Sequence, residues 1–367
     1  METHHVPLSP MEYRFLGRSG LKVSAISIGG WLTYGGHVEE EHTYACLATA
    51  YNHGINFFDT AEGYGGGESE IVMGKAIRKL GWRRSDIVIS TKINFGASNS
   101  IDKSRAQNTV GLSRKHIVEG MKASLERLGL EYVDLVYAHR PDRLTPMEET
   151  VRAFNHVIER GWAFYWGTSE WNAEELNEAH AVAQRLGLIG PLMEQPQYNL
   201  LCREKVEKEF APLYHRHGLG LTTFSPLKFG ILSGKYNNAE IPADSRFSEA
   251  NAAQDAFIRS FREKFKSDAE MRVNLDISRN LGVLAKELGV PQSQLALAWI
   301  LKNKNISSVI TGASKPEQIV ENVGAIAVVE KLTPEVMERI EVILGNKPKL
   351  DQARYGMPEE SIGVKRD

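Results

Sequence analysis

Short runs of β-branched and aromatic residues alternate with segments of helical hydrophobic spacing along almost the whole chain, and no other feature constrains the fold as strongly. Eight runs read as strands, and segments between them, such as 39–51 and 113–128, carry an apolar stripe. Parallel strands need crossover connections, which these segments would supply as helices. The alternation therefore predicts eight parallel strands separated by helices. The predicted strands begin at Ala25, Asn56, Asp86, Asp134, Ala163, Leu192, Gly218 and Ser307.

The length of 367 residues fits either two domains or one large barrel, so the pattern of elements has to decide. Eight strand and helix units with no sign of a second domain favour an α/β fold of the closed (β/α)8 TIM barrel type over an open doubly wound sheet. We expect one barrel domain over residues 1–367, with its core at about 13–347.

Three further segments lie outside the eight units. The residues that flank Gly17–Gly20 predict an N-terminal β-hairpin that caps the lower end of the barrel. The segment from Pro334 to Leu344 predicts a C-terminal helix outside the barrel. Residues Tyr236 to Asp268 form a long, polar and irregular insertion, which is typical of a lid or a mobile loop.

Composition and charge exclude several classes of protein. Lys and Arg number 44 against 46 for Asp and Glu, so we expect no nucleic-acid surface. Cys46 and Cys202 lack any zinc-ligand spacing, which predicts no metal site and fits a reducing compartment. Since no apolar stretch approaches the ~20 residues that span a bilayer, and no signal peptide is evident, we expect a cytoplasmic protein without membrane insertion.

Polar side chains end most of the predicted strands. In a barrel of this type the active site lies at the carboxyl ends of the strands. Any one of these residues could simply cap the next helix or pack in the core, but their recurrence on successive strands indicates a functional site. They are Asp59, Lys92, His139, Ser169, Gln195 and Ser225.

The stretches FDTAEGYG, ISTK, YAHRP, YWGTS, EQPQYN, FSPL and TGASKPEQIVEN resemble the aldo-keto reductase superfamily. The resemblance covers Tyr13 to about Lys347. It is strongest to the branch that holds the β-subunits of voltage-gated potassium channels, through GLSRKHI, KASLERLGLEYVD, PMEETVRA and SGKY. It implies a (β/α)8 fold, a nicotinamide cofactor extended over the barrel mouth, and carbonyl reduction.

Carbonyl reduction needs an acid within hydrogen-bond reach of the substrate oxygen, and Tyr64 is the candidate. A free tyrosine has a pKa of ~10, so a cation must stabilise the developing phenolate, and Lys92 would supply it. Asp59 would pair with Lys92 and orient it. His139 completes the tetrad that the resemblance implies, as a neutral imidazole that donates to the substrate oxygen.

The glycines after Tyr64 match neither G-x-G-x-x-G nor G-x-x-x-x-G-K-[ST]. They read as a flexible loop that lets Tyr64 approach the nicotinamide, or as a simple turn. Trp31, Phe95 and Trp166 are candidate walls of an apolar substrate pocket, although Trp166 lies inside a predicted strand and could belong to the core.

The resemblance also implies a set of cofactor contacts. Ser169 and Gln195 would bind the nicotinamide carboxamide, and Phe224 would stack on the ring. Ser225, Pro226 and Leu227 fall in the loop that contacts the pyrophosphate. The cations and hydroxyls around the adenosine half favour NADP(H) over NAD(H). The remaining predicted contacts are Trp31, Asp59, Lys235, Arg246, Gly312, Ser314, Gln318, Glu321 and Asn322.

The sequence departs from the channel-subunit pattern at three positions in or beside the predicted site. His139 stands where the channel subunits carry asparagine, Glu170 where they carry arginine, and Phe224 where they carry tryptophan. Because most active aldo-keto reductases carry histidine at that position, the resemblance implies a working reductase.

The predicted function is NADPH-dependent reduction of aldehyde or ketone carbonyls to alcohols. The alternative is an NADPH-binding regulatory β-subunit of a potassium channel with slow turnover. The predicted partners are a small carbonyl substrate, further copies of the chain in a homotetramer, and a channel or other protein partner.

Overall fold

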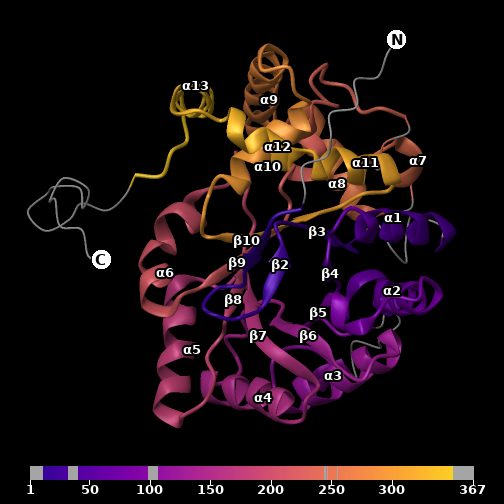
Figure 1. The fold of residues 1–367 in the computed structure, drawn as a ribbon, viewed down its shortest axis with the longest axis vertical. Helices are drawn as coiled ribbons and strands as arrows, with labels where there is room; N and C mark the ends of the chain where they lie inside the picture. Colours follow the sequence, from indigo (N-terminus) through magenta and orange to yellow (C-terminus); the bar gives the residue numbers. More distant parts are fainter. Residues whose placement is uncertain are drawn as a thin grey trace, which may run out of the picture.

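A closed barrel of parallel strands lies at the centre of the molecule (Figure 1). The computed structural model describes residues 11–31, 40–97, 106–243, 245, 247–253 and 255–349. Within them, eight strands close in the order β10-β3-β4-β5-β6-β7-β8-β9, which confirms the predicted (β/α)8 barrel. The strands are β3 (Ile26–Gly29), β4 (Phe57–Asp59), β5 (Val88–Ile93), β6 (Val133–Ala138), β7 (Ala163–Ser169), β8 (Met193–Gln195), β9 (Gly220–Thr223) and β10 (Ile306–Thr311).

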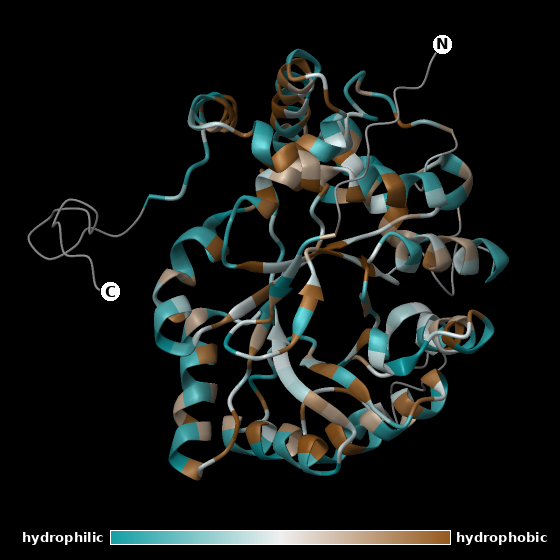
Figure 2. Ribbon diagram, viewed as in Figure 1, coloured by the Kyte–Doolittle hydropathy of each residue, from teal (hydrophilic) through white to brown (hydrophobic). Residues whose placement is uncertain are grey.

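Helices surround the barrel, and Figure 2 shows apolar and polar residues alternating around their turns, as expected for helices with one buried face. Several begin where the sequence provides a cap. The Ser113 hydroxyl accepts from the backbone of His116, and Asn172 forms a capping box with Glu175. The helices are α1 (Glu40–Asn52), α2 (Glu68–Lys79), α3 (Arg114–Leu128), α4 (Met147–Glu159), α5 (Ala173–Leu186), α6 (Ala211–His217), α7 (Glu249–Ala252), α8 (Ala256–Ser267), α9 (Ala269–Glu287), α10 (Gln292–Leu301), α11 (Pro316–Val323), α12 (Ala325–Val328) and α13 (Pro334–Leu344).

The predicted N-terminal hairpin is confirmed and closes the lower end of the barrel. Strands β1 (Tyr13–Phe15) and β2 (Lys22–Ser24) pair antiparallel. Leu16, at the turn, is fully buried in the apolar cluster that fills the barrel interior. The turn lies against the start of β9, where a Cβ added to Gly17 would stand 2.7 Å from the backbone nitrogen of Gly220. The hairpin therefore leaves the opposite end of the barrel as the one open to a ligand.

The segment from Tyr236 to Asp268 is more ordered than the sequence prediction of an irregular insertion. It contains α7 and α8, whose first turns are capped by Ser248 and Asp255. Their apolar side chains form a cluster separate from the main core, which includes Phe261 and Phe265. The prediction was wrong on irregularity because the aromatic residues of α8 repeat every four positions and bury one face of a helix.

The C-terminal helix α13 lies outside the barrel, as predicted, and packs against α9 (Figure 1). The side chain of Arg203, which follows β8, holds it through an ion pair of 2.7 Å to Glu341. The extent of the single domain over residues 1–367 stays a prediction, because both ends of the chain lie outside the described residues.

Candidate active site

A cleft of about 1240 Å³ opens at the carboxyl ends of the barrel strands. Asp59, Ser169, Gln195 and Thr311 reach it from the last positions of four strands, and His139 reaches it from the residue after β6. Chain segments that are far apart in sequence thus present their polar side chains to one space. This is the end of the barrel at which the sequence predicted the site.

Lys92 connects the predicted catalytic residues beneath the cleft. Its Nζ donates to Asp59 Oδ2 at 2.5 Å, to the Thr60 carbonyl at 2.8 Å and to Tyr64 Oη at 3.0 Å. Lys92 is fully buried, so its three donors are all directed at fixed acceptors. Asp59 is in turn oriented by Ser90, whose hydroxyl donates to it at 2.7 Å. The charge of the lysine is therefore held in place next to the phenol.

Burial raises the pKa of Tyr64 above its usual value, even though the Lys92 ammonium acts in the opposite direction. The phenol therefore stays protonated at neutral pH and is available as a donor. Burial is the largest single influence and works to lower the pKa of Lys92, but the charges and hydrogen bonds of Asp59 and Tyr64 together outweigh it, and the net pKa of Lys92 is raised. The lysine consequently remains a cation when the phenol gives up its proton.

His139 lies beside Tyr64, with 5.5 Å between the ring centroids in an edge-on arrangement. Its pKa is lowered well below 6.5, first by burial and then by the cations of Lys92 and Arg140. Its buried Nδ1 has no hydrogen-bond partner within the described part of the chain. A neutral imidazole at the cleft surface can donate to a carbonyl oxygen without adding a second charge beside Lys92.

The glycine run after Tyr64 forms a tight turn. Gly65, Gly66 and Gly67 have φ angles of 59°, 67° and 104°, in the left-handed region that favours glycine. Gly67 then caps α2, which begins at Glu68. Of the two interpretations of the sequence, the turn is the one observed, and it places Tyr64 one residue before the chain reverses.

Glu62 ties the tyrosine turn to the loop after β5. Its Oε1 accepts from the backbone nitrogens of Asn94 at 2.7 Å and Gly96 at 3.0 Å, and lies 3.1 Å from Nε2 of His116. This holds Phe95 in place, and its ring lies 4.9 Å from that of His139. Glu62 had no predicted role, although it lies inside the FDTAEGYG stretch.

The predicted cofactor contacts that the structure describes all line the cleft, whereas Arg246 lies outside the described residues. They extend from the strand ends beside Tyr64 to the start of α11. Residues that line the cleft and were predicted are Trp31, Asp59, Ser169, Gln195, Phe224, Ser225, Pro226, Leu227, Lys235, Gly312, Ser314, Gln318, Glu321 and Asn322.

The loop after β9 has an unusual backbone. Ser225, Lys228 and Phe229 have φ angles of 52°, 46° and 58°. Glu170, which follows β7, has a φ angle of 61°. Residues other than glycine avoid this region, and where they occupy it they cluster at functional sites. These four line the cleft, whereas Ala239, with a φ of 58°, does not. The clustering of four of the five such residues in the described part of the chain supports the assignment of the cleft as the functional site.

Three aromatic residues meet at the rim of the cleft. The ring of Phe257 on α8 lies 5.8 Å from that of Trp31 and 5.6 Å from that of Phe229. Phe95 and Trp31 are cleft walls, as predicted. Trp166 belongs to the core instead, because it is fully buried and stacks on Phe154 of α4 at 5.0 Å.

Arg140, Phe229 and Phe257 also line the cleft and were not predicted to do so. Arg140 follows His139 directly, so its place at a strand end was a usable signal. Phe257 begins the four-residue aromatic repeat of α8 and could have been found from that spacing.

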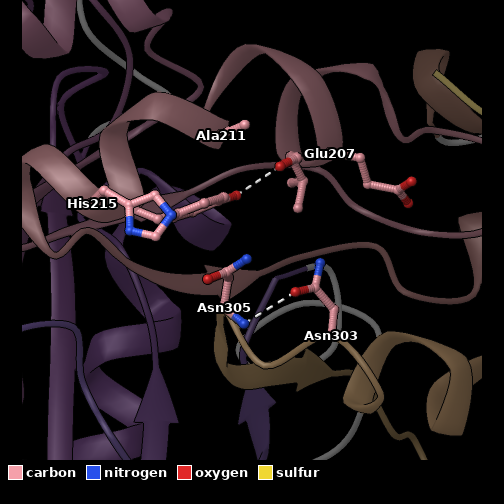
Figure 3. Close-up of a pocket in the computed structure, with 7 residues that line it drawn as sticks. Glu207, Ala211, His215, Asn303 and Asn305 are labelled. Atoms are coloured by element: carbon pink, nitrogen blue, oxygen red, sulfur yellow. Dashed lines mark hydrogen bonds between the residues drawn. The ribbon is translucent and has the colours of Figure 1, made fainter. Parts of the chain in front are cut away.

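A second hollow of about 520 Å³ lies between α6 and the turn before β10 (Figure 3). In it, the backbone nitrogen of Asn305 donates to Asn303 Oδ1 at 3.0 Å. The carboxylate of Glu207 is already bound by Arg203 at 2.7 Å. Because these polar groups are engaged within the protein, the larger cleft is the better candidate for the functional site.

The sequence model described as the Aldo/keto reductase family matches residues 25–344, from just before β3 to the end of α13. The chain belongs to the aldo/keto reductase family. Membership of this family supports an oxidoreductase activity, and proteins of the family generally use NAD(P)H. No helix within the described residues is long and apolar enough to cross a membrane.

Curated relatives of this aldo/keto reductase are named as channel subunits. The chain is 52% identical over 342 residues to a probable voltage-gated potassium channel subunit beta of Arabidopsis thaliana, which covers 92% of this chain and 98% of that protein. It is 52% identical over 347 residues to a putative voltage-gated potassium channel subunit beta of Schizosaccharomyces pombe. That alignment covers 94% of this chain and 96% of that protein. The predicted resemblance to this branch is confirmed.

Proposed function

We propose that this aldo/keto reductase reduces aldehyde or ketone carbonyls to alcohols with NADPH. The observation that carries the proposal is the hydrogen-bonded chain from Asp59 through Lys92 to Tyr64, which opens on the cleft beside His139. A proton donor next to a fixed cation is what the oxygen of a carbonyl needs while its carbon is reduced.

The residues of the cleft fit a dinucleotide phosphate. The hydroxyl of Ser169 and the amide of Gln195 could bind a carboxamide near Tyr64. At the other end, Lys235, Ser314 and Lys315 offer cations and a hydroxyl that suit a 2′-phosphate. Bound there, the reduced nicotinamide would supply a hydride, with its two electrons, to the carbonyl carbon.

The residues of the chain would then complete the reduction. Tyr64 gives its proton to the carbonyl oxygen, which yields the alcohol, and the phenolate is stabilised by Lys92 until it is protonated again from water. His139 donates to the same oxygen and orients it toward Tyr64. Asp59 keeps Lys92 charged and correctly placed.

The test is to follow the absorbance of NADPH with a panel of aldehydes, ketones and quinones, using the wild type and Tyr64→Phe. We expect the variant to bind NADPH as the wild type does and to lose turnover by about 10²-fold to 10⁴-fold, the usual contribution of a positioned acid. Unchanged turnover in the variant would remove Tyr64 from the mechanism.

A second candidate function is that of a regulatory subunit, which the names of the relatives favour. Such a protein would bind NADPH tightly, turn over slowly and act on a channel. Tight NADPH binding without turnover across the substrate panel, together with co-purification of a channel cytoplasmic domain, would support it. Rapid turnover that depends on Tyr64 would favour the reductase.

We further propose a homotetramer in the cytoplasm. The relatives that share 52% of their residues with this chain are named as subunits, which supports an assembly of some kind. Light scattering on the purified protein would give the mass directly, and a mass near the 41.0 kDa of one chain would contradict the tetramer.

A further inference from the structure

Arg140 places a second cation in the cleft. Its Nη1 donates to the carbonyl of His139 at 2.5 Å and to Ser169 Oγ at 3.1 Å. Its guanidinium carbon lies 5.9 Å from the ring centroid of Phe224. The backbone carbonyl of Arg140 is anchored by Asn94 at 3.0 Å. The guanidinium is therefore held between the three strand ends that surround the reacting part of the cleft.

Among the described residues, no carboxylate pairs with the charge of Arg140. It forms no ion pair within the described part of the chain, whereas Lys92 is paired with Asp59 and Lys205 with Glu170. Its Nε and Nη2 form no hydrogen bond there either. Arg140 thus brings to this end of the cleft a positive charge that no carboxylate of the described residues pairs with.

In the proposed reaction the nicotinamide ring would lie in the part of the cleft that Arg140 lines. A hydride passes only between atoms in contact, so the ring must touch the carbonyl carbon whose oxygen meets Tyr64 and His139. The adjoining surface of the cleft is made by Ser169, Phe224 and Arg140. The ring is neutral when reduced and carries a positive charge when oxidised, so a fixed cation there repels only the oxidised form.

We propose that Arg140 makes the site discriminate between the two redox states of its cofactor, so that NADPH binds more tightly than NADP⁺. This rests on the proposed function and deepens it by assigning the redox form of the cofactor that the site holds more tightly. Weaker binding of the oxidised form favours its release after carbonyl reduction and its replacement by NADPH. In a sensing subunit, the same discrimination would make occupancy report the NADPH to NADP⁺ ratio.

The ratio of two dissociation constants tests the role of the charge. NADPH and NADP⁺ share the adenosine, the 2′-phosphate and the pyrophosphate, so the ratio isolates the nicotinamide ring. Both constants would be measured by isothermal titration calorimetry at pH 7.5 for the wild type, Arg140→Gln and Arg140→Lys. Glutamine removes the charge but can still donate to Ser169, whereas lysine keeps the charge and loses the planar fork.

We expect the ratio Kd(NADP⁺)/Kd(NADPH) to fall by about fivefold in Arg140→Gln. This is the effect of removing the repulsion between two unit charges that lie several ångströms apart in a partly hydrated cleft. The ratio should be largely kept in Arg140→Lys, which retains the charge. A ratio that is unchanged in Arg140→Gln, or that falls equally in both variants, would overturn the proposal. If the wild type binds neither form, the proposed function itself fails, which is a distinct result.

Discussion

At the scale of single residues, the site depends on a lysine with no contact with solvent. Lys92 is fully buried and Asp59 nearly so. Both ions lose their hydration, and their attraction offsets this cost only because each one has further partners. The pair is thus a costly arrangement that makes sense as a means to place a cation beside Tyr64.

Replacement of Lys92 by Met should therefore damage both stability and activity. Asp59 would remain as a buried carboxylate without its counter-ion, which typically costs about 3–5 kcal/mol. We expect a lower midpoint of urea unfolding at pH 7.5 and a loss of turnover. The double variant Asp59→Asn with Lys92→Met should recover much of the stability but none of the activity. A Lys92→Met protein as stable as the wild type would contradict this account.

Glu194 is a buried acid outside the catalytic chain. It lies on β8, where its Oε2 accepts from the hydroxyl of Thr168 and its Oε1 has no partner within the described residues. Burial raises its pKa from 4.5 to about 8. At neutral pH the folded protein therefore holds a proton on Glu194 that the unfolded chain has released.

The contribution of Glu194 to stability should consequently fall as the pH rises from about 4.5 to 8, because over this interval the unfolded state binds fewer protons at this residue. Glu194→Gln should abolish this slope and leave the variant more stable than the wild type at pH 8, by on the order of 2 kcal/mol. Urea unfolding at several pH values would measure it. Parallel curves for the two proteins would show that Glu194 does not titrate in this range.

At the scale of elements, the two ends of helix α8 in the insertion after β9 have different roles. Phe265 is 8% exposed and packs in the satellite cluster, while Phe257 is 39% exposed and lies at the rim of the cleft. One face of the helix thus holds the insertion together, and its first turn reaches Trp31 on the other side of the cleft opening.

Replacement by alanine at these two positions of α8 should affect different properties, NADPH dissociation at Phe257 and stability at Phe265. Phe257→Ala should change stability by less than about 1 kcal/mol and increase the rate of NADPH dissociation severalfold, because it removes a rim contact. Phe265→Ala should cost about 3 kcal/mol, as expected for an aromatic residue in a core. Stopped-flow fluorescence and urea unfolding would measure the two effects. An unchanged dissociation rate in Phe257→Ala would exclude a role for the rim.

At the scale of the whole molecule, cofactor binding should be visible as stabilisation. A ligand that binds only the folded state at a hundred times its Kd adds about 2.7 kcal/mol to the free energy of unfolding. We expect NADPH to raise Tm strongly, NADH to raise it less at equal concentration, and Tyr64→Phe to respond to NADPH like the wild type. Equal shifts with NADPH and NADH would contradict the proposed role of the cations near α11.

Closure of the barrel explains how residues so distant in sequence meet. Asp59 and Gln195 are 136 positions apart, yet Gln195 Nε2 donates to Asp59 Oδ1 at 3.2 Å. Parallel strands bring all their carboxyl ends to one edge, and a closed barrel brings that edge together around one space. The hairpin that fills the other end with Leu16 leaves this side as the opening.

The sequence by itself determined the strand and helix alternation and the residues that end the strands, because these follow from the local hydrophobic period. The family resemblance also implied the tetrad, of which Asp59, Lys92 and Tyr64 form a hydrogen-bonded chain and His139 lies with its ring beside that of Tyr64. These properties need no knowledge of distant contacts.

Only the tertiary structure decided what depends on burial and on contacts across the barrel. It showed that desolvation raises the pKa of Tyr64 despite Lys92, that Trp166 belongs to the core, and that the insertion is helical over a core of its own. Within the part of the chain that it describes, it also showed no ion pair at Arg140. Each of these results depends on which groups meet after the chain has closed, and solvent exclusion and charge balance are set there.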